Sequence, residues 1–239
     1  MLEGIYNFLG YFYEPMFLRR ASLALLLLAP ISAGAGVLVV NQRLAFFADA
    51  VGHSVFAGVA LALVMSWPER PVVLGTGVVI GLTVIYLSRH SRLASDTVIG
   101  LVFSGAIALG LAIVSRNPGT AKGLSRFFLG DVLTLGNGEI TALLALAFLS
   151  LIFMLFFYNH LSLESLSPVL ARNRSPWKSR VAPYIFAVFL ALVVTVSVWS
   201  VGVLLATSLL LAPSAVGRHW SASGRSIVRI AVAVLLFSV

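Results

Sequence analysis

One acid and one histidine lie inside an apolar stretch that is long enough to cross a bilayer. Asp49 and His53 belong to the stretch 44–67, and their spacing places them on one face of a helix, one turn apart. A charged side chain at membrane depth is costly and normally faces protein or water along a pathway. Since a carboxylate and an imidazole on one face can share a divalent cation, the spacing indicates a metal ion in transit. Asp-x-x-x-His pairs are common, and the same spacing is typical of two side chains that hydrogen-bond each other or a neighbouring backbone group.

The composition shows which kind of element must position this pair. Of the 239 residues, 60% are hydrophobic and 10% are charged, and the mean hydropathy is +1.04. A soluble domain carries about 25% charged residues. Apolar runs of spanning length recur along the whole sequence, which predicts an all-α, polytopic membrane protein. We expect a single transmembrane domain over 1–239, with about seven apolar spans.

The borders of the apolar runs give the expected elements. The first five spans are expected at 21–40, 44–67, 71–88, 97–115 and 140–158. A further run from 181 to 213 would make roughly 50 Å of helix, against a hydrocarbon core of about 30 Å, so we expect a break near 200–202. Residues 1–20 are rich in aromatic rings and predict an interfacial helix, 161–171 a short amphipathic helix, and 213–225 a polar turn.

Three polar residues near the span ends are given structural roles. Asp96 is expected to cap the helix that follows it. His90 is expected in a solvated loop, and His160 at the lipid headgroups.

The mixed segment 116–139 has an apolar centre with glycine, which fits either a gating or re-entrant turn or an ordinary loop.

Several function classes are excluded or disfavoured. The sequence contains no cysteine, which excludes thiolate metal sites, disulfides and thiol catalysis. It has no Gly-x-x-x-x-Gly-Lys-Ser/Thr motif, so the chain has no phosphate loop of its own for ATP. Four scattered histidines without His-Glu-x-x-His argue against a metalloenzyme. The net charge of +8 lies in short loops and indicates contact with lipid headgroups rather than with nucleic acid.

Four stretches together resemble motifs of the permease subunits of metal-importing ABC transporters, the zinc, manganese and iron family. They occur in the family's order, at residues 43–53, 93–100, 127–133 and 201–213. The first resembles Arg-[Leu/Met]-Ser-[Phe/Tyr]-x-Gly-Asp-x-x-x-His, with Ala45 in place of the usual serine and Ala48 in place of the usual glycine. The likeness covers about Phe17 to Arg229.

This resemblance implies a function and a set of partners. The chain would be the non-enzymatic membrane subunit of an ATP-driven importer of zinc or manganese, possibly iron, in the bacterial inner membrane. A cytoplasmic ABC ATPase, an extracytoplasmic metal-binding protein and a second permease copy would be its partners. No permanently bound cofactor is expected, because the divalent metal is cargo. From the residues alone, a secondary transporter or channel driven by an ion gradient remains the alternative.

The resemblance also implies roles for individual residues. Asp49 and His53 would be the metal-handling pair. Gly130 and Asp131 would belong to a cytoplasmic gate. The stretch 213–226 would be the segment that docks on the ATPase, through Pro213, Gly217 and Arg218. The fold would be similar to that of the cobalamin-importer permease, with a cytoplasmic N-terminus, and the family's last spans would be truncated here.

Overall fold

The structure is a computed structural model that describes residues 16–116 and 135–220, the last four of these by their backbone alone. Within these ranges all regular elements are helices: α2 (Met16–Asn41), α3 (Ala45–Met65), α4 (Glu69–His90), α5 (Ser95–Arg116), α7 (Asn137–Leu166), α8 (Pro168–Arg174), α9 (Pro176–Val201) and α10 (Val203–Trp220). Six of them, all except α8 and α10, are long and apolar enough to cross a membrane, and α10 adds a shorter apolar stretch. The prediction of an all-α polytopic membrane protein is confirmed.

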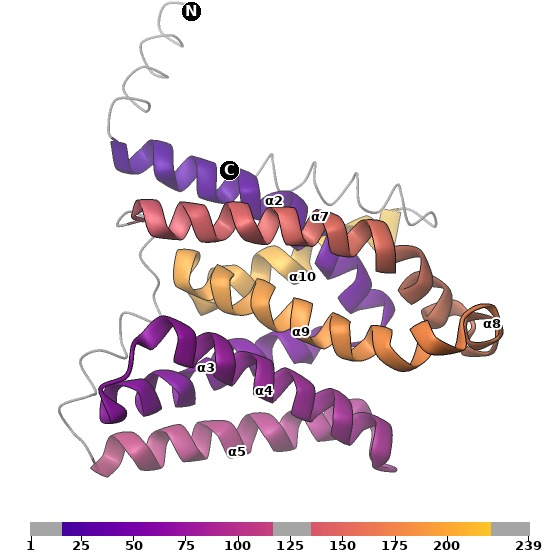
Figure 1. The fold of residues 1–239 in the computed structure, drawn as a ribbon, viewed down its shortest axis with the longest axis horizontal. Helices are drawn as coiled ribbons and strands as arrows, with labels where there is room; N and C mark the ends of the chain where they lie inside the picture. Colours follow the sequence, from indigo (N-terminus) through magenta and orange to yellow (C-terminus); the bar gives the residue numbers. More distant parts are fainter. Residues whose placement is uncertain (1–15, 117–134, 221–239) are drawn as a thin grey trace, which may run out of the picture.

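The long helices run side by side along the long axis of the molecule, with α5 at one edge and α2 and α7 at the other (Figure 1). Small residues allow close packing between neighbours. Gly58 of α3 faces the side chain of Thr76 on α4, and Gly110 of α5 faces Phe56 of α3. Such contacts are the usual means by which helices associate in lipid, where apolar burial alone provides little attraction.

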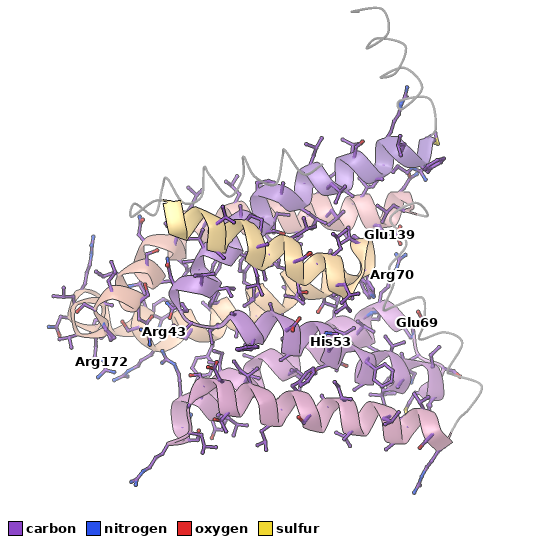
Figure 2. The ribbon with its side chains drawn as sticks, turned by 180° about the vertical axis from the view of Figure 1, so that it is seen from behind. Arg43, His53, Glu69, Arg70, Glu139 and Arg172 are labelled. Atoms are coloured by element: carbon purple, nitrogen blue, oxygen red, sulfur yellow. The ribbon has the colours of Figure 1, made fainter. Side chains whose placement is uncertain are left out.

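Charged side chains gather at the two ends of this bundle. In Figure 2, Arg43 and Arg172 lie at one end, and Glu69, Arg70 and Glu139 lie at the other. We refer to these as the Arg43 end and the Arg70 end. Helices α3, α5 and α9 begin at the Arg43 end, whereas α2, α4 and α7 begin at the Arg70 end.

A polar network holds three helices together at the Arg70 end. Arg20 of α2 donates to the Leu135 carbonyl oxygen at 3.1 Å and to Asn137 Oδ1 at 3.0 Å. Arg70 of α4 forms an ion pair with Glu139 of α7. These contacts fix the chain where α7 begins, directly after residues 117–134.

Two of the expected helix borders are wrong. Residues 16–20 belong to α2, so they are not part of a separate interfacial helix as expected; residues 1–15 lie outside the described part. The stretch 161–171 is not one helix either, because α7 continues to Leu166. Nothing in its sequence stops α7 before Pro168, whose ring cannot continue the helix but suits the first turn of α8.

The expected break near 200–202 is confirmed at Gly202. Its φ of 87° and ψ of 161° belong to a region that side chains with a Cβ rarely adopt, and α9 and α10 meet there. After the break α10 returns along α2, with Leu209 against Ala29 and Ala33. Further along, Leu210 and Ser214 lie against Gly36, so α10 runs in the same direction as α2, toward the Arg43 end (Figure 2).

The polar turn expected from Pro213 onward is wrong in its described part. Helix α10 passes through Pro213 and ends at Trp220. A proline inside a helix removes one backbone hydrogen bond, but packing against a neighbouring helix compensates for that loss in membrane proteins. Pro213 and Ser214 are both buried here, so tertiary packing outweighs the local preference for a turn.

Candidate metal-transit site

Asp49 and His53 lie on the second and third turns of α3, counted from its start at the Arg43 end. His53 Nε2 and Asp49 Oδ1 are 4.0 Å apart, which is too long for a direct hydrogen bond. The Asp49 side chain is 49% exposed and the His53 side chain 28% exposed, so neither is sealed in the core. Oxygen and nitrogen ligands about 2.1 Å from a tetrahedral zinc ion are about 3.4 Å apart. A small side-chain rotation would therefore let one cation contact both.

The turn before α3 starts the helix at the Arg43 end, so that Asp49 and His53 follow one and two turns further into the bundle. Arg43 adopts a left-handed backbone with φ of 58°, and the Leu44 amide donates to the Val39 carbonyl at 2.9 Å. This tight connection lets α3 start immediately beside the end of α2. On the other side, the His53 ring meets Phe103 of α5 edge to face, with centroids 5.9 Å apart.

A cavity of about 230 Å³ opens between the beginnings of α3 and α5. Its lining holds two carboxylates, Asp49 and Asp96, together with Phe46, Ala50, Ile99, Gly100 and Phe103. Because a water molecule takes up about 30 Å³ of liquid, the cavity has room for a cation with part of its hydration shell. Phe103 connects the cavity with His53, since its ring lines the cavity and contacts the His53 ring.

Asp96 was the residue that sequence reasoning missed. It is not the residue before α5 but lies within its first turn, and its side chain borders the same cavity as Asp49. The two acids are far apart in sequence, and the packing of α5 against α3 brings them to one place. Alternate spans of a membrane protein start on the same side, so α3 and α5 both start at the Arg43 end. That alternation could have suggested that Asp49 and Asp96 lie close together.

Ligands for a closed metal site are too few in the described part of the chain. No group of three or more His, Cys, Asp or Glu side chains is placed there to hold one ion. Structural metal sites are closed by four protein ligands, whereas sites with fewer leave positions for water. Two protein ligands such as Asp49 and His53 would leave the remaining positions on a cation to water.

The other expected site residues are placed differently. Gly130 and Asp131 lie outside the described residues, as do the side chains at positions 217 and 218. Pro213 is buried in α10, where no partner protein could reach it in this arrangement. Among the candidates whose side chains the structure describes, Asp49 and His53 lie close together, and Asp96 lines the cavity beside Asp49.

A second polar cluster lies at the Arg43 end, where α4, α7 and α9 meet. His160, which was expected at the lipid headgroups, is 8% exposed among these helices, and its Nε2 lies 3.3 Å from Ser179 Oγ. Arg89 forms an ion pair with Glu164 at 3.1 Å and also donates to the Ser179 carbonyl. This cluster joins three helices and shares no side chain with the cavity.

Known proteins resemble the chain over most of its length. It is 27% identical over 211 residues to the manganese transport system membrane protein MntC of Halalkalibacterium halodurans, covering 87% of this chain and 72% of that protein. It is 25% identical to the high-affinity zinc uptake system membrane protein ZnuB of Haemophilus influenzae, covering 90% and 82%. It is 30% identical over 200 residues to the chelated iron transport system membrane protein YfeD of Yersinia pestis, covering 82% and 66%.

A solved structure and a family model agree with these relatives. The structure of PsaBC from Streptococcus pneumoniae in complex with Fab matches 96% of this chain and 82% of that chain, with a TM-score of 0.78 and 22% identity, which shows the shared fold. The model of the ABC 3 transport family matches residues 14–239. The chain therefore belongs to the ABC 3 transport family and is its multi-pass membrane permease subunit.

Proposed function

We propose that this permease subunit carries manganese or zinc across the bacterial inner membrane, and that Asp49 and His53 contact the ion on its way. The observation that carries this proposal is the pair itself, a carboxylate and an imidazole 4.0 Å apart on the membrane-spanning helix α3. The carboxylate also lines the cavity between α3 and α5. The relatives named for manganese, zinc and chelated iron support this class of cargo. No observation favours the gradient-driven alternative.

The chemistry follows from the small number of ligands. Asp49 and His53 replace part of the hydration shell of the ion, while Asp96 attracts it from the opposite wall of the cavity through water. A pathway must bind an ion strongly enough to admit it and weakly enough to release it. Imidazole and carboxylate suit manganese, iron and zinc alike, so these ligands do not select one of them.

The remaining partners complete the transport cycle. A metal-binding protein delivers the ion, a second permease copy forms the other wall of the pathway, and an ATPase drives the change between outward and inward access. The proposed gate includes Gly130 and Asp131. Of the expected docking residues, Pro213 is buried against the bundle. Docking of the ATPase therefore involves Gly217 and Arg218.

Uptake by variants tests the metal role. Cells that depend on this system would take up radioactive manganese or zinc with the wild type, Asp49→Asn or His53→Ala, and His90→Ala serves as the matched control at an exposed histidine stacked on Tyr86. We expect uptake to fall at least about tenfold in the first two variants and to stay unchanged in the control. Normal uptake by correctly assembled Asp49→Asn and His53→Ala variants would remove the pair from the pathway.

The docking proposal has its own test, because α10 ends toward the Arg43 end whereas α2 begins at the Arg70 end. Docking through Arg218 therefore predicts a cytoplasmic Arg43 end, whereas a cytoplasmic N-terminus predicts a cytoplasmic Arg70 end. The chain contains no cysteine, so Arg43→Cys and Arg116→Cys variants can be labelled individually from outside. Co-purification of the ATPase with Arg218→Glu completes the test, and undiminished association would refute the docking assignment.

A further inference from the structure

The short helix α8 and its flanks form an amphipathic surface at the Arg43 end. Figure 1 looks along the axis of α8, which therefore lies across the ends of α7 and α9 rather than parallel to them. Four large apolar side chains of this segment face outward. Leu166 is 84% exposed and Trp177 is 65% exposed, and Val169 and Leu170 lie between them.

The same segment carries four cationic side chains and no acidic side chain of its own. Arg172, Arg174 and Arg180 are exposed, and Lys178 is partly exposed. No aspartate or glutamate occurs anywhere between residues 165 and 239. The nearest acid in the sequence, Glu164, forms an ion pair with Arg89, and Arg172 contributes a weaker electrostatic attraction to it. Among the described residues, none of the four cations makes an ion pair with a carboxylate.

The segment is also held firmly against the bundle. Ala171 is fully buried between α8 and its neighbours, and the Ser167 hydroxyl accepts a hydrogen bond from the Leu170 amide at 3.4 Å. The exposed apolar and cationic side chains are therefore presented on a fixed support. Their exposure is a property of the fold and not of a loose loop.

We infer that residues 166–180 form a binding surface for anionic phospholipids. Trp177 and the exposed aliphatic side chains lie at the boundary of the hydrocarbon, as aromatic and apolar groups do at membrane interfaces. The guanidinium groups of Arg172 and Arg174 contact the lipid phosphates, since arginine binds phosphate oxygens with two parallel donors. An acidic protein surface would satisfy the cations, but it would not account for large apolar groups exposed beside a membrane-spanning bundle.

The surface has a mechanical role beyond the transport of metal. It fixes the end of α7 and the start of α9 at one depth in the bilayer, and Arg89 of α4 contacts both helices, through Glu164 of α7 and the Ser179 carbonyl of α9. The inference does not depend on which metal is carried or on which residues touch it.

Lipid retention tests the inference. The full-length chain would be placed in nanodiscs of equal phosphatidylglycerol and phosphatidylcholine, extracted, and examined by native mass spectrometry for retained lipid. Each cation near an anionic surface raises affinity about fivefold, so we expect Arg172→Gln/Arg174→Gln to reduce the excess of retained phosphatidylglycerol by about 25-fold. The matched control is Arg92→Gln/Arg116→Gln, which removes two exposed cations outside the segment and should leave the excess unchanged.

Fluorescence quenching gives a second test that needs no change of charge. Lipids brominated near the headgroup should quench the tryptophan fluorescence of the wild type more than that of Trp177→Phe. An unchanged phosphatidylglycerol excess in the double arginine variant would overturn the inference and leave the cations to an acidic protein partner. Equal quenching of the wild type and Trp177→Phe would also overturn it, because Trp177 would then not touch lipid.

Discussion

Helix α10 packs so closely on α2 that a single methyl group at Gly36 should separate them. A Cβ built there lies under 3.0 Å from the Leu210 carbonyl oxygen and from Ser214 Oγ. The serine side chain could rotate, but the carbonyl belongs to the α10 backbone and cannot move alone. Gly36→Ala therefore requires the two helices to shift apart.

The size of the effect follows from the cost of overpacking. Extra carbon atoms in a packed core cost about 1–3 kcal/mol of stability. Alanine also favours the helix over glycine by up to about 1 kcal/mol, which opposes that loss. Gly105→Ala isolates this second contribution, because nothing lies within 4 Å of a Cβ at Gly105 on α5. We expect Gly36→Ala to be less stable than Gly105→Ala by about 1–3 kcal/mol.

Reversible unfolding in mixed micelles, followed by tryptophan fluorescence, measures the free energy of unfolding of both variants. Metal uptake by the same variants shows whether the packing of α10 also matters for transport. Equal free energies of unfolding for Gly36→Ala and Gly105→Ala would refute the reasoning, because α10 could not then lie against α2 at this point.

Three further predictions concern the break, the cavity and the Arg70 end. Gly202→Ala should lower the free energy of unfolding by about 1–3 kcal/mol, measured as above, because alanine is strained at a φ of 87°. Asp96→Asn should raise the metal concentration for half-maximal uptake about tenfold, less than Asp49→Asn does, because a water-separated carboxylate attracts the ion more weakly. Glu139→Ala should cost about 0.5–2 kcal/mol in thermal or denaturant unfolding, because Glu139 accepts from the Gly136 amide at 2.9 Å and pairs with Arg70.

The spans could be predicted because each depends on local composition. An apolar run of sufficient length becomes a helix wherever lipid surrounds it, and Gly202 interrupts one run because it carries no Cβ. Local sequence failed where packing decided the outcome. Pro213 suggested a turn, yet the contact of α10 with α2 keeps it helical.

The site could be predicted only in part, for the same reason. Asp49 and His53 are one turn apart on one helix, so their proximity was visible in the spacing. Asp96 reaches the same cavity, and Arg89 reaches Glu164, only through contacts between different helices. A buried position for His160 likewise depends on Ser179 of another helix, which its own neighbours in sequence do not indicate.

The cavity between α3 and α5 has an electrical consequence. Both helices begin there, and each helix start carries a partial positive charge of about half a proton. Asp96 lies within the first turn of α5 and Asp49 just beyond the first turn of α3, so both carboxylates stand inside these fields. The partial positive charges of the two helix starts thus offset part of the negative charge of these carboxylates. Under the proposed function, a cation in this cavity would be held less tightly than two carboxylates alone would hold it, which would favour its release.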